Sequence, residues 1–254
     1  MTFDASPAAR RLALAWTTQS WIESLPESER PQTLEQAFDV QEALQHQLGQ
    51  TRIGWKIAGS SVRSLRASPT GKAVFGMLWD SCSHESGVTL QLPNQGPLTL
   101  EVEVAVRFAR DVNPAAEPFE SSMIGAAFVA IEVVRSRFCD RKAVGPISFT
   151  ADDAGFHAFI AGDELPNALT SPLLGLPATL KRDGALIAGA LQGEESTDVL
   201  AALRHFWVHA SDRGILIPAG SVVTTGTQTA PADVGEAGLY EGWLGDRAVR
   251  VTYC

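Results

Sequence analysis

Alternating apolar and polar positions mark the segment from Leu98 to Phe108 as a strand. Its even-numbered positions are all apolar, whereas its odd-numbered positions include Glu101 and Glu103. Successive side chains of a strand point to opposite faces, so these two carboxylates point the same way. At about 3.3 Å of rise per residue, their Cα atoms lie about 6.6 Å apart, which lets both side chains reach one bound ion. The alternative is an amphipathic strand that turns an acidic face to water.

A second apolar segment, from Ile124 to Val134, contains one carboxylate, Glu132. Burying a carboxylate is costly unless its charge is compensated, so Glu132 needs a cation. Arg135 and Arg137 are candidates, but odd positions on a continuous strand face away from Glu132. The compensating cation is then a shared metal ion, or a Lys or Arg from a distant part of the chain. Three carboxylates with no Cys or His at ligand spacing favour Mg²⁺ or Mn²⁺ over Zn²⁺.

Helical periodicity predicts helices around these strands. They cover residues 8–24, 33–49 and 197–213. Thr33 and Gln36 form a capping box at the start of the second helix. His205 and His209 lie four residues apart on the third helix, but no Glu follows the first His as in metalloprotease helices, which favours a surface or packing role. Asp183-Gly184 between two strand-like segments predicts a hairpin.

Two further strand-like segments bring polar groups into the apolar pattern. Lys56, in the segment 52–61, is flanked on its face by small residues. That flanking leaves room for a ligand to approach the ammonium group, whereas the alternative is a surface lysine that protects an edge strand. A later strand ends in Thr225, Gly226 and Thr227, whose hydroxyl and backbone donors can hold a carboxylate. A polar turn is the alternative there.

Composition narrows the class of protein. The 254 residues, 45% of them hydrophobic, can bury a substantial core, and a net charge of -9 argues against nucleic-acid and anionic-membrane partners. Small molecules are the expected partners. Neither a signal peptide nor an apolar run of membrane-spanning length is visible, so we expect a soluble, cytoplasmic protein. Cys82, Cys139 and Cys254 are odd in number and scattered, which indicates free thiols.

Several segments, taken in order, resemble the 2-keto-4-pentenoate hydratase / 2-oxohex-3-enedioate decarboxylase group of the fumarylacetoacetate hydrolase superfamily. The resemblance runs over residues 33–253 and is carried by TLEQAFDVQ, GWKIAGSS, LEVEVAVRFARDV, AIEVVRSRF, FTADDAG, LIPAGSVVTTGTQT and GWLGDRAVRV. It implies an α+β fold with a mixed β-roll or barrel core and peripheral helices. One domain would cover residues 1–254, with residues 1–50 as a mainly helical N-terminal part. A homo-oligomer is expected.

The resemblance also implies a site and an activity. Glu101, Glu103 and Glu132 would hold Mg²⁺ or Mn²⁺, and Lys56 would hold or protonate the substrate. Asp152 would support the site or carry a proton. The expected substrate-binding residues are Thr225, Gly226, Thr227 and Arg135. The implied activity is that of a lyase, a hydratase of 2-hydroxypenta-2,4-dienoate (2-oxopent-4-enoate) or a related 2-oxo acid in aromatic compound catabolism.

Departures from the family pattern leave other functions open. Arg135 stands where the family usually has an acid, and Asp153, Gly155 and Val74 also differ from its usual residues. Arg135 near the pocket would favour a substrate with a second carboxylate. The rival functions are the related decarboxylase and a non-catalytic binding or partner subunit of the same fold. A hydrolase is a further rival, for which His84-Glu85 is only a loose candidate catalytic pair.

Overall fold

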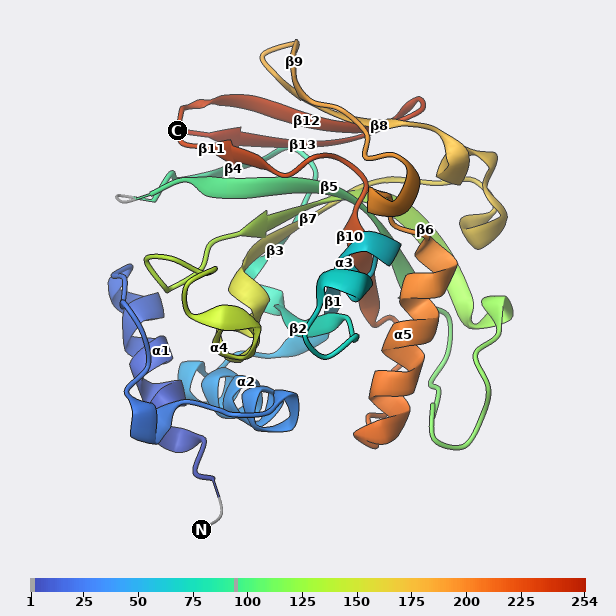
Figure 1. The fold of residues 1–254 in the computed structure, drawn as a ribbon. Coiled ribbons are helices and arrows are strands. Elements are labelled where there is room, and N and C mark those ends of the chain that lie inside the picture. The colour runs from blue at the N-terminus through green and yellow to red at the C-terminus, as the bar shows by residue number, and fades with distance from the viewer. Residues whose placement is uncertain (1–2, 94–95) are drawn as a thin grey trace.

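The computed structural model describes residues 3–93 and 96–254. Met1 and Thr2, which belong to the expected helical part, lie outside the described residues. Within the described part, the chain forms an eight-stranded sheet and a five-stranded sheet with helices at the periphery (Figure 1). None of the helices in these ranges is both long and apolar enough to cross a membrane.

The eight-stranded sheet curls into a half-barrel and carries the candidate site. Its strands are β1 (Arg52–Ala58), β2 (Val74–Trp79), β3 (Ser83–Glu85), β5 (Leu98–Phe108), β6 (Ile124–Val134), β7 (Phe156–Glu164), β10 (Val222–Thr227) and β11 (Ala232–Val234). The order is β2-β1-β10-β5-β6-β7-β3, and β11 pairs with β5. The end strands β2 and β3 do not pair with each other in the described ranges, so the expected mixed sheet is confirmed as an open half-barrel.

Strands β5 and β6 have the boundaries that the alternation and the apolar run indicate. They pair antiparallel along their length. Strand β1 instead pairs parallel with β10, which brings residues 54–56 beside residues 222–224. At Gly54 a Cβ atom would lie 1.8 Å from the carbonyl oxygen of Val222, so this close approach of two backbones requires glycine.

The five-stranded sheet packs over the apolar face of β5 and β6. Its strands are β4 (Val88–Leu90), β8 (Ala178–Arg182), β9 (Ala185–Ala188), β12 (Gly238–Leu244) and β13 (Arg247–Tyr253), in the order β4-β13-β12-β8-β9. The Asp183-Gly184 hairpin between β8 and β9 is confirmed. Val102, Val104 and Ile131 of the first sheet share one apolar core with Val249 and Val251 of the second. The opposite face of β5 and β6 is thereby left for the polar side chains.

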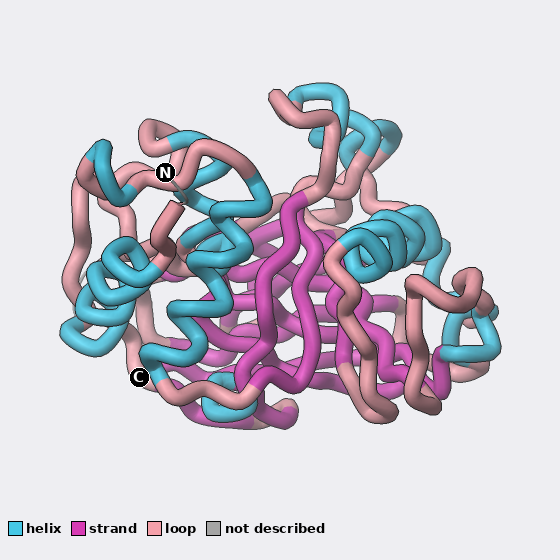
Figure 2. Tube along the Cα trace, turned by 90° about the horizontal axis from the view of Figure 1, so that it is seen from below, coloured by secondary structure: helices cyan, strands magenta, loops and turns pink. Residues whose placement is uncertain are grey.

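Five helices of the described part surround the half-barrel (Figure 2). They are α1 (Ser6–Thr18), α2 (Leu34–Leu48), α3 (Val62–Ala67), α4 (Gly145–Ala151) and α5 (Val199–Asp212). Helix α1 ends before residue 24 because Gln19 adopts a left-handed conformation with φ of 52°. The Thr33 cap is confirmed, since its side chain accepts a hydrogen bond from the amide of Gln36. Helix α5 begins after Asp198, whose carboxylate caps the amide of Ala201.

His209 has the packing role that its spacing on α5 indicated. Its ring stacks on Phe75 with 4.2 Å between centroids and also contacts the ring of Phe38. Burial lowers the pKa of His209 to about 3, so the ring is neutral where it packs. Gln41 ties α2 to this region by donating hydrogen bonds to the carbonyls of Phe75 and Thr150.

Candidate metal and substrate site

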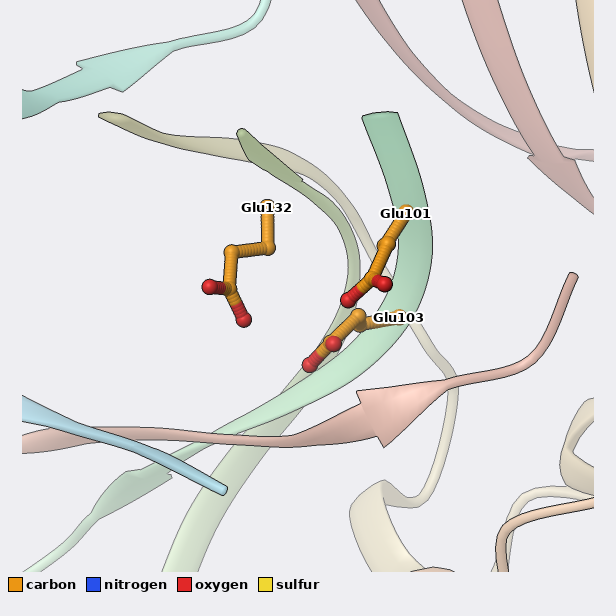
Figure 3. A group of neighbouring side chains, drawn as sticks. All are labelled: Glu101, Glu103 and Glu132. Atoms are coloured by element: carbon orange, nitrogen blue, oxygen red, sulfur yellow. The ribbon is translucent and has the colours of Figure 1, made fainter. Parts of the chain in front are cut away.

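Three carboxylates converge on the polar face of β5 and β6 (Figure 3). In the antiparallel pairing, Glu101 lies directly opposite Glu132, and Glu103 follows two positions along the same face. Each residue places a carboxylate oxygen within 4.8 Å of those of the other two. Glu103 and Glu132 are buried and Glu101 is half-buried. The expected convergence of the three side chains is therefore present in the structure.

Lys56 supplies a positive charge to this cluster. Its Nζ forms an ion pair with Glu132 and donates a hydrogen bond of 3.0 Å to the carbonyl of Ala154. The edge-strand alternative was wrong, because β1 lies between β2 and β10 and Lys56 is only 1% exposed. Burial lowers the pKa of Lys56, but the charges of Glu132 and Glu101 outweigh burial and raise it overall, so Lys56 stays protonated.

The end of β10 orients Glu103. The hydroxyl of Thr224 and the amide of Gly226, at 2.9 Å, both donate hydrogen bonds to Oε2 of Glu103. The register between β10 and β5 shifts between Thr224 and Thr227, which frees the Gly226 amide from the regular ladder. The hydroxyl and amide groups at the end of β10 therefore hold a carboxylate, as the sequence indicated, but this carboxylate is the side chain of Glu103 and not a substrate.

The predicted substrate-binding residues of β10 are placed differently from one another. The hydroxyl of Thr225 donates to the carbonyl of Val104 at 2.8 Å on the opposite face of the strand. Gly226 and Thr227 line the cavity beside Glu101. Sequence reasoning missed Thr224, although strand alternation places Thr224 on the same face as Gly226.

The residues of the cluster fit a divalent cation. Oε1 of Glu103 and Oε2 of Glu132 are buried without a hydrogen-bond partner in the described part of the chain. Burial and the charge of Glu132 raise the pKa of Glu101 to about 7 and raise that of Glu103 well above its ordinary value. Lys56 contacts this cluster through Glu132, and Arg141 acts on Glu101 from farther away. Hard carboxylate oxygens are the ligands that Mg²⁺ prefers. These unpartnered oxygens are suited to holding such an ion.

Two cavities lie beside Glu101 and share Ala58 and Glu101 in their walls. The larger, of about 440 Å³, extends along Ser60 and Thr197 toward α3. The smaller, of about 280 Å³, extends past Lys56 toward the loop that precedes α4. A small molecule beside Glu101 could extend into either cavity.

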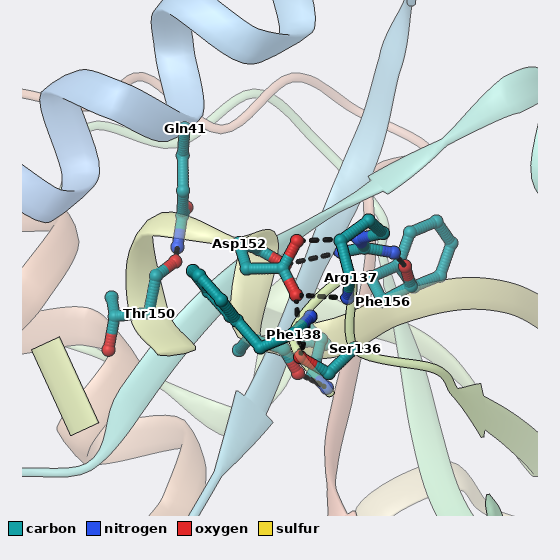
Figure 4. A network of polar contacts seen from close by, with 9 residues as sticks. Gln41, Ser136, Arg137, Phe138, Thr150, Asp152 and Phe156 are labelled. Carbon is teal, nitrogen blue, oxygen red and sulfur yellow. Dashed lines mark hydrogen bonds and ion pairs between the residues drawn. The ribbon is translucent and has the colours of Figure 1, made fainter. Parts of the chain in front are cut away.

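Asp152 belongs to a separate buried network (Figure 4). Its carboxylate pairs with the guanidinium of Arg137 and accepts hydrogen bonds from the Arg137 amide at 2.8 Å and the Ser136 hydroxyl at 2.9 Å. Asp152 lines neither of the two cavities. Its contacts anchor the segment that follows β6 against α4.

Arg135 also lies apart from the three glutamates. Strand β6 ends at Val134, and the side chain of Arg135 donates a hydrogen bond of 3.3 Å to the carbonyl of Gln19. It lines a different cavity, of about 250 Å³, together with His157. The structure therefore does not bring Arg135 into the cavities beside Glu101, and neither Arg135 nor Arg137 is the partner of Glu132.

Asp153, which the sequence marked only as a departure from the family pattern, contributes to the surroundings of Lys56. Its Oδ1 accepts a hydrogen bond of 2.7 Å from the amide of Met77, and burial raises its pKa to about 7. This bond fixes the turn that presents the Ala154 carbonyl to Lys56. At Gly76, a Cβ atom would lie 2.8 Å from the Asp153 carbonyl and 2.9 Å from Cγ of Lys56. The Asp-Asp pair gave no signal for this contact, because acidic pairs are common in turns.

Comparisons with known proteins identify the fold. The sequence matches no family model, and no curated protein matches it. Among solved structures, 4-oxalocrotonate decarboxylase from Pseudomonas putida G7, complexed with magnesium and adipate, has a TM-score of 0.85 at 20% identity over 98% of this chain and 97% of that chain. The same enzyme complexed with calcium and acetate has a TM-score of 0.83 at 20% identity and the same coverage of both chains. A putative fumarylacetoacetate hydrolase family protein from Yersinia pestis CO92 has a TM-score of 0.57 at 16% identity over 80% of this chain and 93% of that chain. The chain therefore has the fold of 4-oxalocrotonate decarboxylase and the fumarylacetoacetate hydrolase family, as the sequence resemblance implied.

Proposed function

We propose that this chain is a divalent-metal-dependent lyase of 2-oxo acids in aromatic compound catabolism. The observation that carries the proposal is the convergence of Glu101, Glu103 and Glu132, of which Glu101 lines two cavities. These residues would hold Mg²⁺ or Mn²⁺. When bound, such a cation supplies Lewis-acid stabilisation of negative charge on substrate oxygens.

The chain's own residues bind the substrate and hold a proton. Lys56 lines the smaller cavity, and its protonated Nζ has a third N–H besides those that contact Glu132 and Ala154, so it would hold an anionic oxygen or give a proton to a substrate carbon. Thr227 lines the larger cavity and would contact the substrate, while Thr224 and Gly226 keep Glu103 in place. Asp152 would act only as a positioning residue, because its oxygens are already bound by Arg137 and Ser136.

Decarboxylation of a 2-oxo diacid such as 2-oxohex-3-enedioate is the reaction that these observations support best. The full-length similarity in fold is to a decarboxylase whose structure holds magnesium and a six-carbon diacid. Hydration of 2-hydroxypenta-2,4-dienoate, the activity that the resemblance in sequence implied, is the second candidate. Both reactions develop negative charge on a 2-oxo acid beside the same glutamates, so the fold does not separate them. The cytoplasmic location and the homo-oligomeric assembly stay predictions.

Ultraviolet assays on both substrates test the proposal. The purified chain is stripped with a chelator and assayed with and without added Mg²⁺, and carbon dioxide release is measured in parallel. We expect metal-dependent turnover that Glu132→Gln abolishes and that Glu164→Gln, at an exposed strand carboxylate, leaves intact. Mg²⁺ binding without turnover of either substrate would favour the non-catalytic binding subunit. Turnover that is unaffected by the chelator would refute the metal-dependent mechanism.

A further inference from the structure

The two cavities that meet at Glu101 differ in the charge of their walls. The larger cavity is lined by one cation, Arg63, and that side chain is paired with Glu195, which lines the same cavity. The smaller cavity is lined by Lys56, Arg141 and Lys142, and its only acidic side chain is Glu101. The smaller cavity is therefore the electropositive end of the site.

Arg141 is the half-buried cation of this cavity that makes no ion pair among the described residues, although its charge acts on Glu101 from a distance and opposes the rise in the pKa of that carboxyl. Lys56 is already paired with Glu132, whereas neither Arg141 nor Lys142 forms an ion pair within residues 3–93 and 96–254. Asp140, the acid on the same loop, turns its carboxylate to the backbone amides of residues 142 and 143. The side chain of Arg141 is half-buried, and its guanidinium lies 5.9 Å from the ring centroid of Phe149, another wall residue.

We propose that Arg141 binds the second carboxylate of a dicarboxylate substrate whose 2-oxo acid end lies at Glu101, Glu103 and Glu132. The inference rests on the proposed function for the position of the 2-oxo acid end. A guanidinium presents a planar set of donors that matches a carboxylate in a two-bond arrangement. Lys142 is exposed and adds positive charge at the mouth of the cavity.

This assignment places the recognition of a diacid on a different residue from the one that the sequence suggested. Arg135 was the expected cation, but it lies in a separate cavity. Arg141 lies seven residues beyond the end of β6, on the loop that leads to α4. The specificity for a second carboxylate would therefore depend on this loop and not on the strand that carries Glu132.

Binding of two saturated acids of equal length tests the inference directly. Adipate and hexanoate are titrated calorimetrically into the wild-type chain in the presence of Mg²⁺, and into Arg141→Gln, Arg141→Lys and Arg66→Gln. We expect Arg141→Gln to weaken adipate binding by about 10- to 100-fold and to leave hexanoate binding unchanged. Arg141→Lys should restore part of the loss. Arg66, an exposed arginine outside both cavities, serves as the matched control and should alter neither affinity.

Steady-state kinetics of Arg141→Gln separate an effect on substrate binding from an effect on the chemical step. With a dienoic diacid as substrate, Arg141→Gln should raise KM more than it lowers kcat, because the lost contact exists before the reaction begins. Circular dichroism should show an unchanged fold, since Arg141 has no hydrogen bond to lose in the described part of the chain. If adipate affinity is unchanged in Arg141→Gln, or if adipate and hexanoate are weakened equally, the assignment is overturned while turnover by the wild type still supports the proposed function. If Arg141→Gln weakens adipate binding but the wild type turns over neither 2-oxohex-3-enedioate nor 2-hydroxypenta-2,4-dienoate, the role of Arg141 stands and the proposed reaction fails.

Discussion

Replacing Lys56 by methionine removes the buried positive charge that compensates Glu132 and preserves a long, unbranched side chain. In the metal-free chain, the three carboxylates would then face one another without the ammonium group that contacts them. The carbonyl of Ala154 would also lose the hydrogen bond from Nζ. We therefore predict that Lys56→Met destabilises the metal-free protein, in addition to lowering turnover.

The expected loss of stability in Lys56→Met follows from the burial of the ion pair. Removing one partner of a buried ion pair costs about 3–5 kcal/mol, because the remaining charge is left without compensation. For a domain of this size, that corresponds to a fall of roughly 6–20 °C in Tm. Low pH and a bound divalent cation should each reduce this loss of stability. As the pH falls, Glu101, whose pKa is raised to about 7 by burial and the charge of Glu132, becomes protonated and one negative charge is removed. A bound divalent cation would replace the missing positive charge.

Urea unfolding of the wild type and of Lys56→Met provides the assay. The two proteins are compared at pH 8 and pH 5.5 with a chelator, and at pH 8 with saturating Mg²⁺. Lys72→Met, which removes an exposed lysine, serves as the control and should change the free energy of unfolding by no more than about 0.5 kcal/mol. Equal stability of Lys56→Met and the wild type at pH 8 in the chelator would refute the reasoning. A loss of the same size at pH 5.5, or with Mg²⁺, would show that the carboxylates are not its cause.

Three further predictions concern the partners of the site. Thr224→Val removes a hydroxyl that orients Glu103 and should weaken Mg²⁺ binding by about 10- to 100-fold, measured by titration calorimetry; an unchanged affinity would show that this hydroxyl does not position the ligand. Because the folded state raises the pKa of Glu101 from 4.5 to about 7, the folded chain keeps a proton that the unfolded chain has lost between these pH values. The stability contributed by that proton should fall as the pH rises through this window. His209, whose pKa is lowered by burial, has the opposite effect, so urea unfolding of the metal-free wild type is compared with that of Glu101→Gln at several pH values; a stability of the wild type relative to Glu101→Gln that does not fall as the pH rises would contradict the prediction. Asp152→Asn leaves the buried guanidinium of Arg137 without its counter-ion and should cost about 3–5 kcal/mol, while the protein that remains folded binds Mg²⁺ normally. A loss of metal affinity without a loss of stability would instead place Asp152 in the metal site.

Local patterns were sufficient to predict the strands that carry the glutamates. Alternation gives the boundaries of β5 and β6 and places Glu101 and Glu103 on one face, because the two-residue period of a strand is a property of the backbone. The need of Glu132 for a cation also follows from its apolar neighbours. The identity of that cation does not, because Lys56 reaches Glu132 only after β1, β10 and β5 have been placed side by side.

Residues whose roles depend on a turn or a register shift were harder to predict. Thr225 stands in the middle of the hydroxyl cluster, yet strand alternation and the shift opposite Glu103 give the contact to Thr224 and Gly226 instead. Arg135 follows directly after a site strand, but the strand has ended there and its side chain packs toward Gln19. Family motifs identify such segments without revealing which way each side chain points.

The parallel pairing of β1 with β10 has a consequence for folding during synthesis. Residues 54–56 leave the ribosome long before residues 222–224, yet both segments are neighbours in the finished sheet. Until β10 is synthesised, the backbone N–H and C=O groups of β1 and β5 that pair with β10 have no partner strand. Such unpaired strand edges favour association with other chains. Glu101, Glu103 and Glu132 already lie on the paired strands β5 and β6, but Lys56 joins them, and Thr224 and Gly226 orient Glu103, only when β10 is inserted. The metal affinity proposed for these glutamates would therefore reach its full value only in the completed sheet, so it would report whether a newly synthesised chain has inserted β10.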